Sequence, residues 1–110
     1  MMLKITESYK TAVISTAHVT QHDSECLPNI CFDPLTDRGL NWVHGTEYGW
    51  IVRAGMRGND WKEELRDYGV TWQTIENIQK VMDAGFDAVH FDCDADIVDG
   101  LESWTWWGKG

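Results

Sequence analysis

Basic residues are scarce in this 110-residue chain, and its last quarter has almost none: no Lys or Arg occurs between Val81 and Gly108. The whole chain has 9 Lys and Arg against 18 Asp and Glu, which leaves a formal net charge of −9. Direct binding of nucleic acid needs clustered Lys and Arg, so the composition argues against that function. An acidic protein is expected instead to bind a basic protein surface, including that of a nucleic-acid-binding complex.

Long apolar runs are also missing. The N-terminal sequence MMLKITESYK has no apolar core region, and no stretch reaches the length that spans a bilayer. The three cysteines are an odd number in a chain without a signal peptide, which argues against a disulfide framework. We therefore expect a cytoplasmic protein without membrane association, folded as a single domain over residues 1–110.

The motifs of common catalytic sites are absent too. There is no G-x-S-x-G elbow and no Gly-rich phosphate loop. An EF-hand starting at Asp92 is excluded, because Ile97 stands where glycine is needed and Ser103 where glutamate is needed. Ser15 is expected on the opposite face of a strand from His18, so His18 is interpreted as a structural hydrogen-bonding residue. The sequence thus predicts no catalytic residue and no cofactor.

Apolar patterning predicts an α/β (α+β) fold with a small mixed sheet of three to four strands and two main helices. Strands are expected over residues 9–19, 40–43, 48–55 and 89–97, with residues 44–46 as a hairpin turn. A short helix would begin at Thr20 and be ended by Pro28. The two main helices would span residues 60–69 and 71–85. Four tryptophans are predicted to be core residues: Trp42, Trp50, Trp61 and Trp72.

The segment VHFDCDADI alternates strictly, which is typical of a half-buried strand. Val89, Phe91 and Cys93 are alternate residues and would lie on the apolar face of this strand. Cys93 is therefore expected to be a buried thiol. His90 and three aspartates occupy the other alternate positions, so they would form a row on the opposite face of the strand. The aspartates are Asp92, Asp94 and Asp96. Carboxylates favour Mg²⁺, Mn²⁺ or Ca²⁺, so a metal-dependent hydrolase or transferase is the alternative function.

A second candidate metal site lies nearer the N-terminus. Two histidines and two cysteines form a His-x3-His-x3-Cys-x4-Cys series, which consists of His18, His22, Cys26 and Cys31. These residue types are zinc ligands, although zinc sites more often have closer pairs separated by a longer loop. The spacing therefore favours unpaired thiols over a zinc site.

Tryptophans crowd the C-terminus immediately after the acidic strand. Aromatic anchors rimmed by charge are typical of interfaces, so this end is a candidate docking patch. The alternative is a tail that folds back over the sheet. The predicted partner-binding residues are Asp92, Asp94, Asp96, Asp99, Glu102, Trp104, Trp106 and Trp107. The same patch could bind a second copy of the chain, so a homodimer stays an alternative.

Three short motifs resemble a small family of uncharacterised bacterial proteins found on plasmids, prophages and other accessory regions. They are ISTAH near the N-terminus, a mid-chain Gly-Trp strand, and a closing D-x-D…DGL…W tail. The matching positions are Ser15, Thr16, His18, Gly49, Trp50, Asp92, Asp94, Asp99, Gly100, Leu101 and Trp106. Ala95 departs from the glycine that the pattern expects, which suggests a longer acidic strand here.

The resemblance implies a genomic setting more than an activity. Small acidic proteins of mobile elements commonly bind and block other proteins. The sequence therefore favours a non-catalytic accessory protein that inhibits a host defence or nucleic-acid-binding complex, of the anti-CRISPR or anti-restriction type.

Overall fold

The strand at Ala88–Asp92 (β4) lies inside a four-stranded sheet in the computed structural model, which describes residues 2–56 and 58–105. Its partners are β1 (Thr11–Ser15) and β3 (Gly49–Val52), and β2 (Val43–Thr46) completes the order β1-β4-β3-β2. β1 runs parallel to β4, whereas the other two pairings are antiparallel. The sheet is thus mixed, and the predicted α+β fold class is confirmed.

Three α-helices occur in the described part of the chain: α1 (Gln21–Ile30), α2 (Trp61–Asp67) and α3 (Trp72–Asp83). The Thr20 side chain accepts a hydrogen bond from the Asp23 amide at the start of α1. Gly69 follows α2 and Gly85 follows α3 with φ angles of 98° and 105°, values that glycine adopts without strain. No helix in the described ranges combines the length and the hydropathy needed to cross a membrane.

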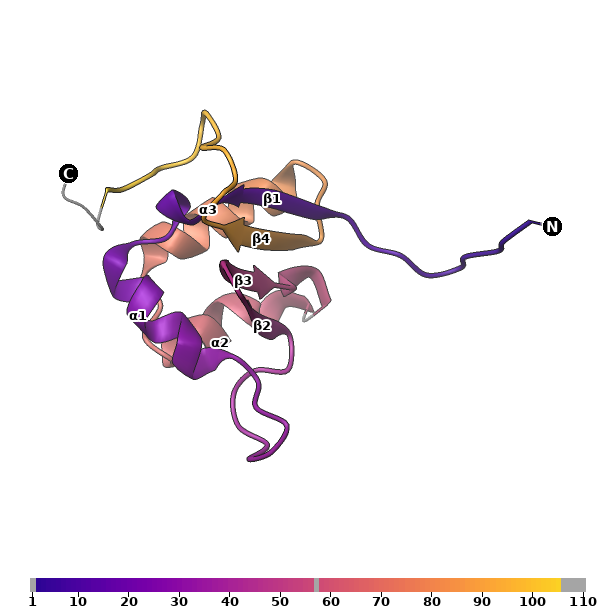
Figure 1. Ribbon diagram of the computed structural model, residues 1–110, viewed down its shortest axis with the longest axis horizontal. Helices are drawn as coiled ribbons and strands as arrows, with labels where there is room; N and C mark the ends of the chain where they lie inside the picture. The colour runs from indigo at the N-terminus through magenta and orange to yellow at the C-terminus, as the bar shows by residue number, and fades with distance from the viewer. Residues whose placement is uncertain (1, 57, 106–110) are drawn as a thin grey trace.

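The helices cover one face of the sheet and leave the other open (Figure 1). On the covered face, Val89 and Phe91 of β4 are fully buried against residues of all three helices. On the open face, the register aligns Val13, His90, Ile51 and His44 in one row across the four strands. Val13 is 56% exposed there. The architecture therefore has two layers, and the region before β1 extends away from the body (Figure 1).

Gly49 explains the Gly-Trp motif of β3. A Cβ at this position would collide with the carbonyl oxygen of Phe91 in the neighbouring strand β4. Trp50 pairs with Phe91, and it packs against the core from the covered face. The two residues of the motif thus allow β3 to approach β4 closely and then fill the space between sheet and helices.

Two predicted boundaries near the N-terminus are wrong. The strand expected over residues 9–19 ends at Ser15, because the Ser15 hydroxyl accepts a hydrogen bond from the Ala17 amide and starts a 3-10 turn (Thr16–His18, η1). Pro28 does not end α1 but lies inside it. Burial of the fully enclosed Ile30 side chain in the core keeps the last turn helical despite the missing amide donor.

The hairpin and one tryptophan also differ from expectation. Residues 44–46 belong to β2 instead of forming the turn, since pairing Val43 with Val52 places both side chains in the core. Trp72 was predicted to be a core residue, but it is 49% exposed, and the Arg66 guanidinium lies 4.8 Å from the centre of its ring. It begins α3 just outside the helix face that packs on the sheet.

Candidate functional site

The acidic strand ends at Asp92, five residues earlier than its alternating pattern predicts. The Asp92 carboxylate accepts a hydrogen bond from the Asp94 amide at 2.8 Å, and the Asp92 carbonyl accepts one from the Ala95 amide at 3.0 Å. This local turn competes successfully with continued strand pairing, as aspartate side chains often do. Cys93 is consequently exposed, not buried, and the aspartates do not form one row on a sheet face.

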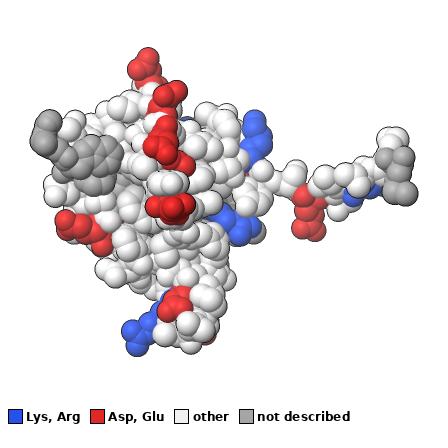
Figure 2. All heavy atoms as spheres, viewed as in Figure 1, with Lys and Arg blue, Asp and Glu red and all other residues white. Residues whose placement is uncertain are grey.

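Residues 92–104, here called the acidic segment, display their carboxylates to solvent. Asp94, Asp96, Asp99 and Glu102 are exposed, and Asp92 is partly exposed. Among the described residues, none of the five carboxylates forms an ion pair with Lys or Arg. The other oxygen of Asp92 lies 3.8 Å from His90 Nε2. Figure 2 shows Asp and Glu side chains running down the upper part of the molecule, where the acidic segment passes.

The buried side chain of His18 forms hydrogen bonds with the backbone of the acidic segment. The imidazole is fully buried, and the Val98 amide donates to its Nε2 atom at 2.9 Å. Because Nε2 accepts this bond, Nδ1 carries the proton and donates it to the Glu102 carbonyl at 2.7 Å. The interpretation of His18 as a structural hydrogen-bonding residue is confirmed, and its ring holds the neutral Nδ1–H tautomer.

Asn77 of α3 provides a second attachment that the sequence analysis missed. Its amide nitrogen donates to the carbonyls of His18 and Glu102 at 3.0 and 2.9 Å, and its carbonyl accepts from the Glu102 amide at 3.1 Å. The residue is 1% exposed. A polar side chain between Ile75 and Ile78, on a helix face that is mostly apolar, is the signal that could have revealed it.

Backbone hydrogen bonds complete the attachment. The Ser15 amide donates to the Asp96 carbonyl at 3.1 Å, and the Trp104 amide donates to the Ala17 carbonyl at 2.8 Å. Trp104 is half-buried, so at this residue the tail folds back onto the body. Trp106 and Trp107, the other two predicted anchors, lie outside the described residues.

The aspartate metal site is brought together only in part. Possible ligand atoms of Asp92, Cys93 and Asp94 lie within 4.8 Å of one another, and Asp96 does not belong to this group. One Asp92 oxygen already accepts the Asp94 amide. The exposed turn is therefore a looser arrangement than the predicted three-aspartate cluster.

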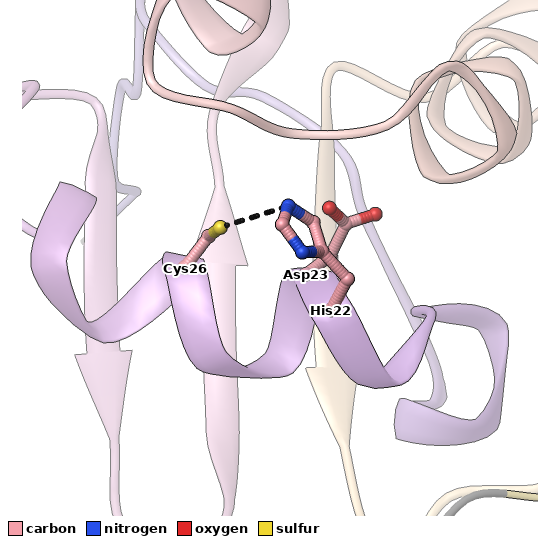
Figure 3. A group of neighbouring side chains, drawn as sticks. All are labelled: His22, Asp23 and Cys26. Atoms are coloured by element: carbon pink, nitrogen blue, oxygen red, sulfur yellow. Dashed lines mark hydrogen bonds between the residues drawn. The ribbon is translucent and has the colours of Figure 1, made fainter.

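The structure separates the four residues considered as zinc ligands, in agreement with the preference for unpaired thiols. His18 is engaged with the acidic segment, and the Cys31 thiol donates to the Leu27 carbonyl at 3.2 Å. His22 and Cys26 do meet, and they are joined by Asp23, which was not among the predicted ligands (Figure 3). A different set of three residues thus lies close together in place of the four candidate ligands.

Comparison with known families adds one finding. Residues 11–106 match the model described as a family of unknown function, the DUF5983 C-terminal domain. The chain belongs to the DUF5983 family. No curated protein and no solved structure matches it. The resemblance to an uncharacterised family is thereby confirmed.

The motifs that carried the resemblance have a shared structural role in this DUF5983 domain. His18, from the ISTAH motif, holds the backbone on either side of the DGL motif, at Val98 and Glu102. Motifs about 80 residues apart in the sequence therefore form one structural unit. Because this unit fixes the backbone that displays the carboxylates, it is the best candidate for a functional site.

Proposed function

We propose that this DUF5983 domain is a non-catalytic accessory protein whose acidic segment binds a basic protein surface. One observation carries the proposal. Among the described residues, the exposed carboxylates of the acidic segment have no Lys or Arg partner, and the backbone that displays them is fixed by hydrogen bonds to the buried side chains of His18 and Asn77. Charges that are already arranged need little reordering on binding, which lowers the entropic cost of association. They also accelerate encounter with an oppositely charged surface.

An apolar groove beside the acidic segment supports the same proposal. It runs along β1 and is bounded by the segment and the end of α3, with Val13, Val81 and Val98 among its lining residues. Val13 and Val98 are 56% and 38% exposed. Interfaces combine an apolar centre with a charged rim, and the groove with Asp99 at its border offers both.

The finer part of the proposal concerns the partner. Complexes that hold DNA or RNA present clustered Lys and Arg, and an acidic protein can occupy such a surface in place of the phosphates. We propose that this domain is an accessory protein of a mobile genetic element and that it inhibits a host defence complex of the anti-CRISPR or anti-restriction type. The net charge of −9 is consistent with this role.

Charge reversal within the acidic segment tests the proposal. Asp94→Lys/Asp99→Lys is the variant to use, because Asp92 maintains the turn and should stay intact. Its matched control is Glu63→Lys/Glu76→Lys, which changes the net charge equally at exposed positions on α2 and α3. Both proteins and the wild type are used to capture partners from a bacterial lysate, and the captured protein is then purified and its affinity measured at low and moderate salt.

We expect a basic nucleic-acid-handling partner that the control retains and the Asp94/Asp99 variant loses, with binding of the wild type weakened by salt. Equal binding by the two variants would contradict the assigned face. Co-expression of the chain with the captured complex then measures inhibition directly, as the loss of its nuclease or nucleic-acid-binding activity.

A divalent-metal-dependent hydrolase or transferase is the second candidate function. The proximity of Asp92, Cys93 and Asp94 at one turn favours it. Binding of Mg²⁺, Mn²⁺ or Ca²⁺ at that turn would stabilise the folded state by about 2.7 kcal/mol when the ion is present at 100 times its Kd. The melting temperature would rise accordingly. An unchanged melting temperature with all three ions would argue against this function.

A further inference from the structure

A histidine, an aspartate and a cysteine meet near the start of α1, away from the acidic segment. His22 and Cys26 are four residues apart and therefore neighbours on one side of the helix. The His22 Nε2 atom lies 3.4 Å from the Cys26 Sγ atom, and potential ligand atoms of all three residues lie within 4.8 Å of one another. In Figure 3 the His22 ring faces the Cys26 thiol, and the Asp23 carboxylate lies beside the ring.

The separation of nitrogen and sulfur suits one particular ion. In a tetrahedral zinc site, Zn–S and Zn–N bonds of about 2.3 and 2.0 Å place the two ligand atoms roughly 3.5 Å apart. The observed 3.4 Å between His22 and Cys26 therefore needs almost no adjustment. Thiolate, imidazole and carboxylate together favour Zn²⁺ over Mg²⁺ or Ca²⁺, which prefer oxygen donors.

The environment of Asp23 suits a bound cation. Its side chain is fully buried, and its oxygens accept bonds from the Thr71 amide at 2.9 Å and the Thr71 hydroxyl at 2.6 Å. Both donors are neutral, and within the described part of the chain no Lys, Arg or His forms an ion pair with this carboxylate. A buried carboxylate without a counterion is costly, and a cation bound beside it would remove that cost.

We propose that His22, Asp23 and Cys26 bind a structural zinc ion. On binding, the Cys26 thiol releases its proton to solvent, and the His22 imidazole moves its proton from Nε2 to Nδ1 so that Nε2 is free to bind the metal. In the structure, Nε2 donates to the Gly69 carbonyl at 2.9 Å, and zinc binding would replace this bond. The Gly69 oxygen or a water molecule completes the coordination.

Zinc at this position would join α1 to the turn between α2 and α3, where Gly69 and Thr71 lie. Asp23 already makes that connection through Thr71, and the metal would reinforce it. The site is independent of the proposed partner-binding function, because none of its residues contacts the acidic segment in the described hydrogen bonds.

Burial, followed by the charges of Asp23 and Glu25, raises the pKa of the Cys26 thiol. Zinc binding would displace the thiol proton, as it does in other sites with a thiolate ligand.

Titration of the reduced, metal-free chain with Co²⁺, followed by displacement with Zn²⁺, tests the site. We expect one ion per chain and the near-ultraviolet absorption of a thiolate bound to cobalt. Cys26→Ser should abolish this absorption and weaken binding by at least about 10–100-fold. The matched controls Cys31→Ser and Cys93→Ser should retain both. Wild-type protein without the thiolate absorption, or Cys26→Ser protein with it, would overturn the proposal.

Two further variants keep the test independent of folding. His22 is exposed, so His22→Ala should fold normally and still lose affinity. Asp23→Asn preserves the shape of the side chain that contacts Thr71 but removes its charge, and it should weaken binding while retaining the thiolate absorption at saturating metal. In wild-type protein, zinc should protect Cys26 from alkylation while Cys93 stays reactive, and equal reactivity of the two thiols would contradict the site.

Discussion

Replacing Asn77 by Ala should destabilise the domain and release the acidic segment. The substitution removes three hydrogen bonds, two of them to Glu102 and one to the His18 carbonyl. Each bond contributes about 0.5–1.5 kcal/mol net, and a buried group left unpaired costs more. The Glu102 backbone can form hydrogen bonds with water if the segment opens. The His18 carbonyl belongs to a fully buried residue, so it would lose its Asn77 partner without gaining water. We therefore expect a loss of about 2–3 kcal/mol.

Urea unfolding and amide hydrogen exchange measure the two parts of this prediction. For a domain of this size, the expected loss corresponds to a fall in Tm of roughly 10–20 °C. Exchange at residues 98–104 should accelerate more than exchange in β4. Gln79→Ala is the matched control, because Gln79 lies on the same helix and makes one exposed hydrogen bond, to Asp83. A loss below about 1 kcal/mol for Asn77→Ala, or unchanged exchange at residues 98–104, would refute the assigned role.

Two other predictions concern the sheet. Gly49→Ala should lower the free energy of unfolding by about 2–3 kcal/mol, because the added methyl group collides with the Phe91 carbonyl and forces β3 away from β4. Thermal or urea unfolding measures this loss. A variant as stable as the wild type would contradict the close approach of the two strands. Burial and the Arg53 guanidinium hold the pKa of His44 below its usual 6.5, so the unfolded chain takes up the proton first and stability should fall as pH drops through about 6.5. Urea midpoints at about pH 7.5 and about pH 5.5 should differ less for His44→Gln than for the wild type, and an equal difference would contradict this.

Local signals predicted the helical half of the fold well. α2 and α3 carry start signals, an apolar stripe and a glycine with positive φ after the last turn, and all of these act within a few residues. The sequence could not predict how Pro28 fits inside α1, because burial of Ile30 against the sheet outweighs the local cost of proline.

The candidate site was predicted less completely, for a physical reason. Alternation alone extended β4 to residue 97, but the Asp92 side chain bonds the Asp94 amide and turns the chain. The carboxylates were identified correctly as exposed groups, whereas their attachment to His18 and Asn77 depends on contacts between residues 25 to 84 positions apart. Such contacts leave no periodic pattern, so only the three-dimensional structure reveals them.

The attachment of the acidic segment has a consequence for how copies of this chain behave toward one another. β1 lies at an edge of the sheet, and an edge strand with free backbone groups can pair with a strand of another molecule. At one end of β1, the Ser15 amide donates a hydrogen bond to the Asp96 carbonyl, so it is not free to pair with another strand. The neighbouring carboxylates also repel a second acidic chain. Substitutions that remove those charges would remove the repulsion, so strand-to-strand aggregation of such variants should begin at this edge.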